Sequence, residues 1–283
     1  MTIKSIAVIG SGTMGSGIAQ VCAAAGFPVS MIDVSDAAVE RGIAAIGASL
    51  DRLVKKDKLG AAERDATLDL IRGSTSYENL RDADLVIEAA TERKELKISI
   101  LRQVEALVGA DKIIATNTSS ISITELAGAL ARPERFIGTH FFNPVPMMAL
   151  LELIRGIQTA DATHAAMMDF SDRIGKSAIT VRNSPGFVVN RILVPMINEA
   201  IFVLQEGLAS AQDIDAGMKL GCNHPIGPLA LADMVGLDTT LAVMEVFYDG
   251  FKDPKYRPAP LLREMVAAGW LGRKSGRGFY QYD

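Results

Sequence analysis

The chain has 283 residues, 49% of them hydrophobic and 22% charged, with a formal net charge of −4. This composition is typical of a globular enzyme with one or two domains, and the absence of a long basic tract argues against nucleic acid as a partner. No apolar stretch reaches the roughly 18 residues of a membrane span, and the start, MTIKSIAVIG, does not read as a signal peptide. Cys22 and Cys222 are far apart, which indicates neither a disulfide framework nor a metal site. We expect a soluble, cytoplasmic protein without membrane partners.

The strongest signal is residues 6–33, IAVIGSGTMGSGIAQVCAAAGFPVSMID. An apolar run leads into Gly10-x-Gly12-x-x-Gly15, a helix-forming stretch follows, and a second apolar run ends at Asp33. This order of strand, tight turn, helix, strand and acid is the dinucleotide-binding fingerprint.

Each part of the fingerprint has a physical role. Gly10 makes the tight turn, Gly12 lets a pyrophosphate approach the backbone, and Gly15 allows close helix packing. The start of the helix, with Thr13 and Met14, offers unpaired N–H groups to phosphates. Asp33 would accept hydrogen bonds from ribose hydroxyls and repel a 2′-phosphate, so the cofactor is predicted to be NAD rather than NADP.

Strand-like and helix-like segments then alternate, which predicts an α/β, Rossmann-type, doubly wound and mostly parallel sheet. In chain order we expect a helix over 36–59, a strand over 85–89, a helix over 94–108, and strands over 113–116, 136–140, 150–154 and 178–181. The breaker Asn183-Ser184-Pro185-Gly186 ends this pattern.

The chain after this breaker is helical almost throughout, which predicts an all-helical C-terminal domain. We place an NAD-binding domain over residues 1–183 and a helical substrate and dimerisation domain over 184–283. The stretch 187–206 is apolar on most faces, so it is buried in a core or against another subunit.

His140 ends a predicted strand, where ligands of open α/β sheets bind. Glu152 follows on the next apolar run. If these strands are neighbours, the carboxylate meets the imidazole and fixes its tautomer, which suits a general base. Taken alone, the pattern favours a structural histidine and an ion-paired glutamate.

Asn117-Thr118-Ser119-Ser120 follows another predicted strand at the same edge. One hydroxyl here can reach a substrate oxygen. A second serine, Ser120 or Ser122, is expected to cap the next helix.

Six segments occur in the order seen in one known family: GSGTMGSGIAQ, VIEAATE, ATNTSSISIT, GTHFFNPVPMMALLELIRG, NSPGFVVNRIL and GCNHPIGPLALADMVGLD. Through them the chain resembles the 3-hydroxyacyl-CoA dehydrogenases, and most closely the bacterial 3-hydroxybutyryl-CoA branch. The resemblance extends from Ile6 to the terminal GRKSGRGFYQYD.

This resemblance implies NAD-dependent interconversion of a short-chain L-3-hydroxyacyl-CoA and its 3-ketoacyl-CoA by a homodimer. His140 matches the catalytic base, Glu152 its acidic partner, and Ser119 the residue that binds the C3 oxygen. Asn190 matches the asparagine that completes the site from the helical domain. The positions that match the nicotinamide half of the cofactor site are Glu92, Lys97 and Asn117.

A basic cluster of Arg52, Lys55, Lys56 and Lys58 lies near the end of the helix that follows Asp33. Its first three members fall at i, i+3 and i+4 and share a helix face. The cluster either holds the phosphates of coenzyme A or is a solvated helix end.

Three alternatives remain beside the acyl-CoA dehydrogenase. A sugar-acid dehydrogenase of the gulonate type shares the site motifs, whereas a 3-hydroxyisobutyrate type uses a catalytic lysine. A non-catalytic, crystallin-like NAD-binding protein is disfavoured by the intact set of four catalytic residues. Acyl chain length, physiological direction and oligomeric state are not fixed by the sequence.

Overall fold

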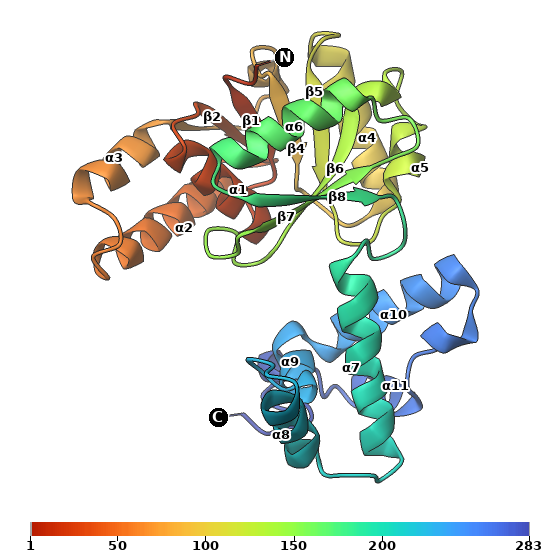
Figure 1. Cartoon of the computed structure of the whole chain (residues 1–283). Helices are drawn as coiled ribbons and strands as arrows, with labels where there is room; N and C mark the ends of the chain where they lie inside the picture. The colour runs from red at the N-terminus through yellow and green to blue at the C-terminus, as the bar shows by residue number, and fades with distance from the viewer. Residues whose placement is uncertain (1, 283) are drawn as a thin grey trace. The chain divides into compact units, whose positions relative to one another are not determined.

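A computed structural model describes residues 2–282 of the chain. The chain separates into two compact units, the first ending at Asn183 and the second beginning at Ser184. Within the described residues, the first unit holds an eight-stranded sheet with helices and the second is helical (Figure 1). This arrangement confirms the predicted fold class.

The sheet has the strand order β3-β2-β1-β4-β5-β6-β7-β8. Neighbouring strands are parallel except for the antiparallel pair β6 and β7. The strands are β1 (Ile6–Ile9), β2 (Val29–Ile32), β3 (Ile71–Ser74), β4 (Leu85–Glu88), β5 (Ile113–Asn117), β6 (Phe136–Phe141), β7 (Leu150–Arg155) and β8 (Ser177–Arg182).

Strands β1, β4 and β6 are buried along their whole lengths, as expected for strands covered on both faces. One core cluster joins the sheet to three helices, through Ile18 of α1, Ile46 of α2 and Phe170 of α6. Helices α4 and α5 contact strands β4 to β6 and lie on the other side of the sheet (Figure 1). The helices of this unit are α1 (Thr13–Ala24), α2 (Asp36–Val54), α3 (Ala61–Asp69), α4 (Lys94–Leu107), α5 (Ile123–Ala127) and α6 (Asp161–Arg173), with short 3₁₀ turns at Tyr77–Leu80 and Pro133–Arg135.

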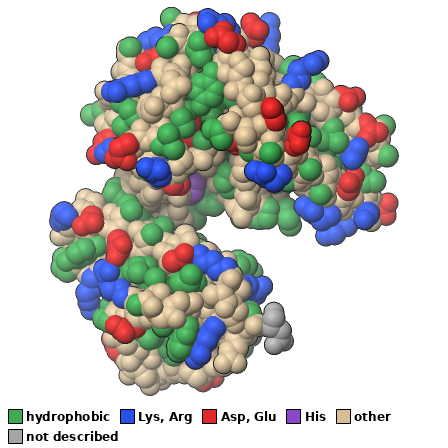
Figure 2. All heavy atoms as spheres, turned by 180° about the vertical axis from the view of Figure 1, so that it is seen from behind, with side chains coloured by type: hydrophobic (Ala, Val, Ile, Leu, Met, Phe, Trp, Pro, Cys, Tyr) green, Lys and Arg blue, Asp and Glu red, His purple; other side chains and the backbone are tan. Residues whose placement is uncertain are grey.

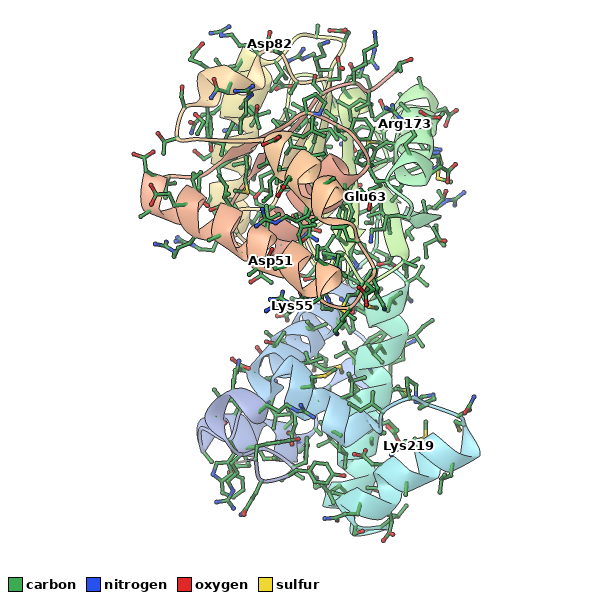
Figure 3. All side chains as sticks on the ribbon, turned by 90° about the vertical axis from the view of Figure 1, so that its left-hand side faces the viewer. Asp51, Lys55, Glu63, Asp82, Arg173 and Lys219 are labelled. Carbon is green, nitrogen blue, oxygen red and sulfur yellow. The ribbon has the colours of Figure 1, made fainter. Side chains whose placement is uncertain are left out.

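The region after α2 differs from the sequence prediction. A helix was expected to Leu59, but α2 ends at Val54 and Asp57 adopts a left-handed conformation with φ 53°. The chain then turns into α3, and Asp51 of α2 pairs with Arg64 of α3 at 3.1 Å. Figure 3 shows Asp51 and Glu63 on these two helices. Helix α3 and the edge strand β3 had no predicted counterpart.

The second unit consists of α7 (Val189–Gln205), α8 (Ala211–Gly221), α9 (Pro228–Val235), α10 (Leu237–Phe251) and α11 (Pro260–Ala267), with 3₁₀ turns at Pro254–Tyr256 and Arg273–Ser275. Its core includes Ile201, Leu229 and Leu262. The C-terminal segment is fastened by Asp233, whose carboxylate accepts the N–H groups of Phe279 and Tyr280.

The surface of each unit carries mixed charges. In the view of Figure 2, basic and acidic side chains are interspersed with hydrophobic ones on both units, without a field of one sign. Among residues 2–282, no helix is long and apolar enough to cross a membrane.

Candidate active site

The crevice of the sheet lies where the strand order reverses, between β1 and β4. Gly10 follows β1 with φ +99°, and a Cβ there would lie 2.7 Å from the carbonyl oxygen of Ala89. A Cβ on Gly15 would lie 1.8 Å from the carbonyl oxygen of Gly10, so the helix can approach the turn only through glycine. A Cβ on Gly12 would meet nothing within 4 Å, which leaves the turn open on its outer side.

Helix α1 begins in this turn without a side-chain cap at Gly12. The first N–H groups of a helix, here those of Thr13 and Met14, have no carbonyl partner within the helix. Together with the open space beside Gly12, they form a cradle that suits a pyrophosphate.

Asp33 follows β2 and faces the same turn. Its Oδ2 accepts the backbone N–H and the hydroxyl of Ser11, each at 2.7 Å, and its Oδ1 accepts the N–H of Val34 at 2.7 Å. Burial raises the pKa of Asp33, but these hydrogen bonds and the charge of Arg41 outweigh burial and lower the pKa below its ordinary value. The carboxylate therefore stays ionised.

A cavity of ≈ 840 Å³ opens beside this carboxylate. Gly10 and Asp33 line one end of the cavity, and Tyr77, Leu96 and Ile100 line its apolar part. The glycine turn, the helix start, the acid and this cavity together fit an adenine dinucleotide.

His140 lies in β6 and Glu152 lies directly opposite it in β7. The two strands are thus neighbours, and the His140 Nδ1–H donates to Glu152 Oε2 at 2.6 Å. Glu152 is fully buried and His140 is 6% exposed. Because an ionised carboxylate only accepts, the proton of the neutral imidazole is held on Nδ1 and Nε2 is the basic nitrogen.

The loop after β5 carries Ser119 at the same edge of the sheet. Glu92 holds this loop, since its Oε1 accepts the N–H of Ser119 at 2.8 Å and the Ser119 hydroxyl at 3.1 Å. Its Oε2 accepts the hydroxyl of Thr118 at 2.8 Å. The hydroxyl of Ser122 accepts the N–H of Glu125 and caps α5. The sequence predicted this role for either Ser120 or Ser122.

Lys97 is completely buried beneath this loop. Its ammonium donates to Glu88 Oε2 at 2.6 Å, to the Thr116 hydroxyl at 3.1 Å and to the carbonyl oxygen of Asn117 at 2.9 Å. The three N–H groups of the ammonium are therefore used inside the protein.

Asn117 links this loop to the histidine strand. Its side-chain oxygen accepts the N–H of Phe141, the residue after His140, at 3.1 Å. Glu88, Thr116 and Asn117 thus join the ends of β4, β5 and β6. Glu88 and Thr116 were missed by the sequence prediction, because a single polar residue at the end of an apolar strand carries no motif.

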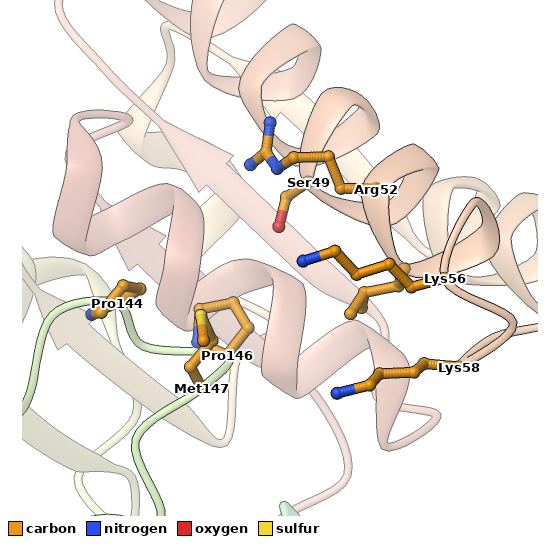
Figure 4. A pocket seen from close by; sticks show the side chains of 8 residues that line it. Ser49, Arg52, Lys56, Lys58, Pro144, Pro146 and Met147 are labelled. Atoms are coloured by element: carbon orange, nitrogen blue, oxygen red, sulfur yellow. The ribbon is translucent and has the colours of Figure 1, made fainter.

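A second cavity, of ≈ 470 Å³, lies between the end of α2 and the loop that joins β6 to β7. Arg52, Lys56 and Lys58 line one side, and Pro144 and Met147 lie opposite them (Figure 4). The prediction of one helix face for Arg52, Lys55 and Lys56 is wrong, because α2 ends at Val54. Lys55 does not line the cavity, whereas Lys58, beyond the turn, does.

The loop between β6 and β7, on the far side of this cavity, is held in place by Lys176. The ammonium of Lys176 donates to the carbonyl oxygens of Val145 and Met148 at 2.6 and 2.7 Å. Asn190, the remaining predicted site residue, lies in the first turn of α7 in the second unit.

A doubly wound sheet with a glycine turn, an acid after the second strand and a histidine–carboxylate pair at one edge defines a dinucleotide-dependent oxidoreductase. Comparison with known proteins agrees. The profile of the 3-hydroxyacyl-CoA dehydrogenase NAD-binding domain matches residues 5–184, and that of the C-terminal domain of the same enzymes matches residues 186–282. The chain belongs to the 3-hydroxyacyl-CoA dehydrogenase family, and its cofactor is NAD.

Individual relatives cover the whole chain. A 3-hydroxybutyryl-CoA dehydrogenase of Bradyrhizobium diazoefficiens is 51% identical over 280 residues, which are 99% of this chain and 96% of that protein. One of Clostridioides difficile is 48% identical over 98% of this chain and 99% of its own length. The crystal structure of (S)-3-hydroxybutyryl-CoA dehydrogenase from Ralstonia eutropha is 64% identical, with a TM-score of 0.98 over 100% of both chains.

Proposed function

We propose that this enzyme interconverts L-3-hydroxybutyryl-CoA and acetoacetyl-CoA with NAD, a step of short-chain fatty-acid and butanoate metabolism. The observation that carries the proposal is the buried 2.6 Å contact between His140 and Glu152 at the sheet edge that also holds the dinucleotide turn. The names of the relatives supply the substrate class.

In the direction of oxidation, His140 Nε2 takes the proton of the substrate's C3 hydroxyl. NAD, held by the glycine turn and Asp33, would supply the acceptor for the hydride that leaves C3. Glu152 stabilises the imidazolium that forms and keeps the ring oriented, because its carboxylate already holds Nδ1–H. In the direction of reduction, His140 returns this proton to the ketone oxygen.

Ser119 is proposed to bind the C3 oxygen. Its hydroxyl is within reach of Glu92, so that carboxylate sets the orientation of the serine. We propose that Lys97 supports the cofactor side of the site through Asn117, because its ammonium is fully used by internal acceptors. Asn190 is proposed as a further substrate contact on the resemblance alone.

The coenzyme A part of the substrate needs cations for its phosphates. Arg52, Lys56 and Lys58 converge on one cavity beside the loop that follows the His140 strand, which supports an acyl-CoA over a free hydroxy acid. Lys56→Ala is expected to raise KM for acetoacetyl-CoA about tenfold and to leave KM for NADH unchanged. Lys55→Ala is the matched control, because Lys55 lies one residue away and outside the cavity.

Further parts of the proposal concern the setting of the enzyme. The exposed apolar side chains of the second unit support a homodimer. Cys22 and Cys222 are free thiols, which supports a reducing, cytoplasmic location.

The proposal is tested by following NADH absorbance with acetoacetyl-CoA and then with free keto acids, acetoacetate among them. We expect rapid oxidation of NADH with the thioester and little with the free acids. A preference for a free keto acid would favour the sugar-acid type of dehydrogenase, and NADH binding without turnover of any of these compounds would favour a non-catalytic protein.

A further inference from the structure

The loop that carries Ser119 runs from the end of β5 to the start of α5, and it is held at both ends. At its beginning, the hydroxyl of the fully buried Thr118 donates to Glu92 Oε2 at 2.8 Å and accepts the N–H of Ile121 at 3.1 Å. At its end, Ser122 caps α5. The place of Ser119 therefore depends on both anchors, and Glu92 supplies only the first.

Asn183 supplies the second anchor. It directly follows β8 and is the last residue of the first unit. Its side-chain Oδ1 accepts the N–H of Ile123 at 2.7 Å, and its Nδ2 donates to the hydroxyl oxygen of Ser122 at 3.1 Å. Its backbone N–H donates to the carbonyl oxygen of Arg155, the last residue of β7, at 3.0 Å. One side chain thus ties the ends of β7 and β8 to the point where the chain enters α5.

The start of α5 also lies directly on the strand that carries His140. A Cβ on Gly138, two residues before His140, would lie 2.6 Å from Ile123 Cδ1, so glycine at this position allows the contact. The first N–H groups of a helix have no partner within it, and Asn183 accepts the one from Ile123. A helix of five residues has little stability of its own, so its direction depends on such contacts.

We infer that Asn183 is a positioning residue of the reaction, which acts by fixing the end of the loop that presents Ser119. The inference rests on the proposed function, because it assumes that the Ser119 hydroxyl binds the C3 oxygen of the substrate. A hydroxyl that is displaced by a fraction of an ångström still exists but no longer meets the reacting atom, and the rate falls.

A plain helix cap is the rival explanation of these contacts. A cap contributes to stability whatever the loop does, whereas a positioning residue matters only while the positioned group is present. The two explanations therefore differ in how the effect of Asn183 depends on Ser119. A cycle of single and double variants measures this dependence.

The cycle consists of the wild type, Asn183→Leu, Ser119→Ala and the double variant, each assayed for kcat/KM with acetoacetyl-CoA at saturating NADH. We expect Ser119→Ala to lower this value about 10- to 100-fold, the effect of a lost hydrogen bond to an oxygen that gains charge. Asn183→Leu keeps the size of the side chain without its polar atoms, and it should lower the value about three- to tenfold. In the Ser119→Ala background, Asn183→Leu should cause no further loss.

A conservative variant and a remote cap separate positioning from stability. Asn183→Asp keeps an acceptor for the Ile123 N–H and offers a second one to the Ser122 hydroxyl, so its kcat/KM should stay close to the wild-type value. Ser210→Ala removes the side-chain cap of α8 in the second unit. It should lower the thermal midpoint about as much as Asn183→Leu does, because each loses a helix cap, but leave kcat/KM unchanged.

Two further readouts should stay at their wild-type values in Asn183→Leu, namely NADH affinity and the pH profile of kcat/KM, because Asp33 and the pair His140–Glu152 are untouched. Asn183→Ala is measured in the same cycle in case leucine does not allow folding. The same fold loss with and without the Ser119 hydroxyl, or a loss in Ser210→Ala equal to that in Asn183→Leu, would overturn the inference. Normal activity of Asn183→Leu or of Ser119→Ala would overturn it as well. A wild type that does not oxidise NADH with acetoacetyl-CoA would instead refute the proposed function itself, and the inference with it.

Discussion

Asp33 is the residue that we propose to set the choice of cofactor. It sits at the end of β2 with both carboxylate oxygens directed by hydrogen bonds from Ser11 and Val34. An ionised carboxylate at this place accepts from ribose hydroxyls and repels a 2′-phosphate. The lowered pKa means that this discrimination does not depend on pH in the neutral and mildly acidic range.

Replacement of Asp33 by Asn should therefore weaken the binding of NADH and reduce the preference of the enzyme for NADH over NADPH. We expect KM for NADH to rise about tenfold or more, the value of a hydrogen bond to a charged group, and the preference over NADPH to shrink. Steady-state kinetics with both cofactors measure this change. For the wild type, the preference should persist at about pH 5, because the carboxylate is still charged there. A preference that vanishes at that pH in the wild type would contradict the role of Asp33.

The sequence pointed to some site residues and not to others. Asp33, Ser119, His140 and Glu152 stand in motifs or at strand ends. Lys97 was predicted only through the family resemblance, because a polar residue in an amphipathic helix reads as part of its solvated face. Only the fold shows that Lys97 is buried.

At the scale of elements, the buried pair Lys97–Glu88 joins α4 to the ends of β4 and β5. Removal of either side chain leaves the charge of the other one unpaired in a fully buried position. Lys97→Met should lower the free energy of unfolding by about 3–5 kcal/mol.

The double variant Lys97→Met with Glu88→Gln should lose clearly less stability than the sum of the two single variants. Denaturant unfolding of all four proteins closes this cycle. If the double variant loses as much stability as the two single variants together, the two residues are not coupled. The matched exposed pair Lys252–Asp249 should show a coupling close to zero.

Asp84 ties the opposite edge of the sheet together. Its carboxylate accepts the backbone N–H of Lys4 and Ser5 and the ammonium of Lys112. Burial raises the pKa of Asp84, but these hydrogen bonds outweigh burial and lower the pKa below its ordinary value. A carboxyl with a lowered folded pKa stabilises the fold above its unfolded pKa, and this contribution is lost as the pH falls through the folded value.

Asp84→Asn should consequently reduce stability by about 1–2 kcal/mol near neutral pH. The difference from the wild type should shrink as the pH drops below about 4, where the wild-type carboxyl begins to be protonated in the unfolded chain. Urea unfolding over a series of pH values measures both curves. A constant difference down to the lowest pH would contradict the ionic origin.

The elements that were not predicted have only weak patterns in the sequence, and the reasons are physical. Strand β3 reads Ile71-Arg-Gly-Ser74 at the edge of the sheet, with one buried apolar side chain. The end of α2 was placed too late because Lys55 to Lys58 contains no glycine or proline, and the turn depends on Asp57 in a left-handed conformation. Buried central strands such as β4 and amphipathic helices such as α4 were predicted correctly within one residue at each end.

At the scale of the whole molecule, several large apolar side chains of the second unit are strongly exposed. Ile192 of α7, Leu208 and Leu220 are 68%, 68% and 88% exposed. Such side chains in one small unit favour burial against a second copy. We expect light scattering at micromolar concentration to give twice the chain mass of 30.2 kDa.

Ile192→Glu should shift this assembly toward monomers, because it would place a charge at an exposed apolar position of α7 that the dimer is expected to bury. Ile157→Glu in the first unit, where the side chain is 87% exposed, is the control and should leave the mass unchanged. A monomeric wild type would rule the dimer out.

The central claim is that His140, oriented by Glu152, moves the proton during hydride transfer. The most direct measurement is kcat for acetoacetyl-CoA reduction by His140→Gln, together with NADH affinity from fluorescence titration. We predict that kcat falls by roughly 10²–10⁴-fold, the value of a positioned general acid–base. NADH affinity should stay near the wild-type value, because the glycine turn and Asp33 are untouched. Near-normal turnover, or a defect explained wholly by lost NADH binding, would contradict the account.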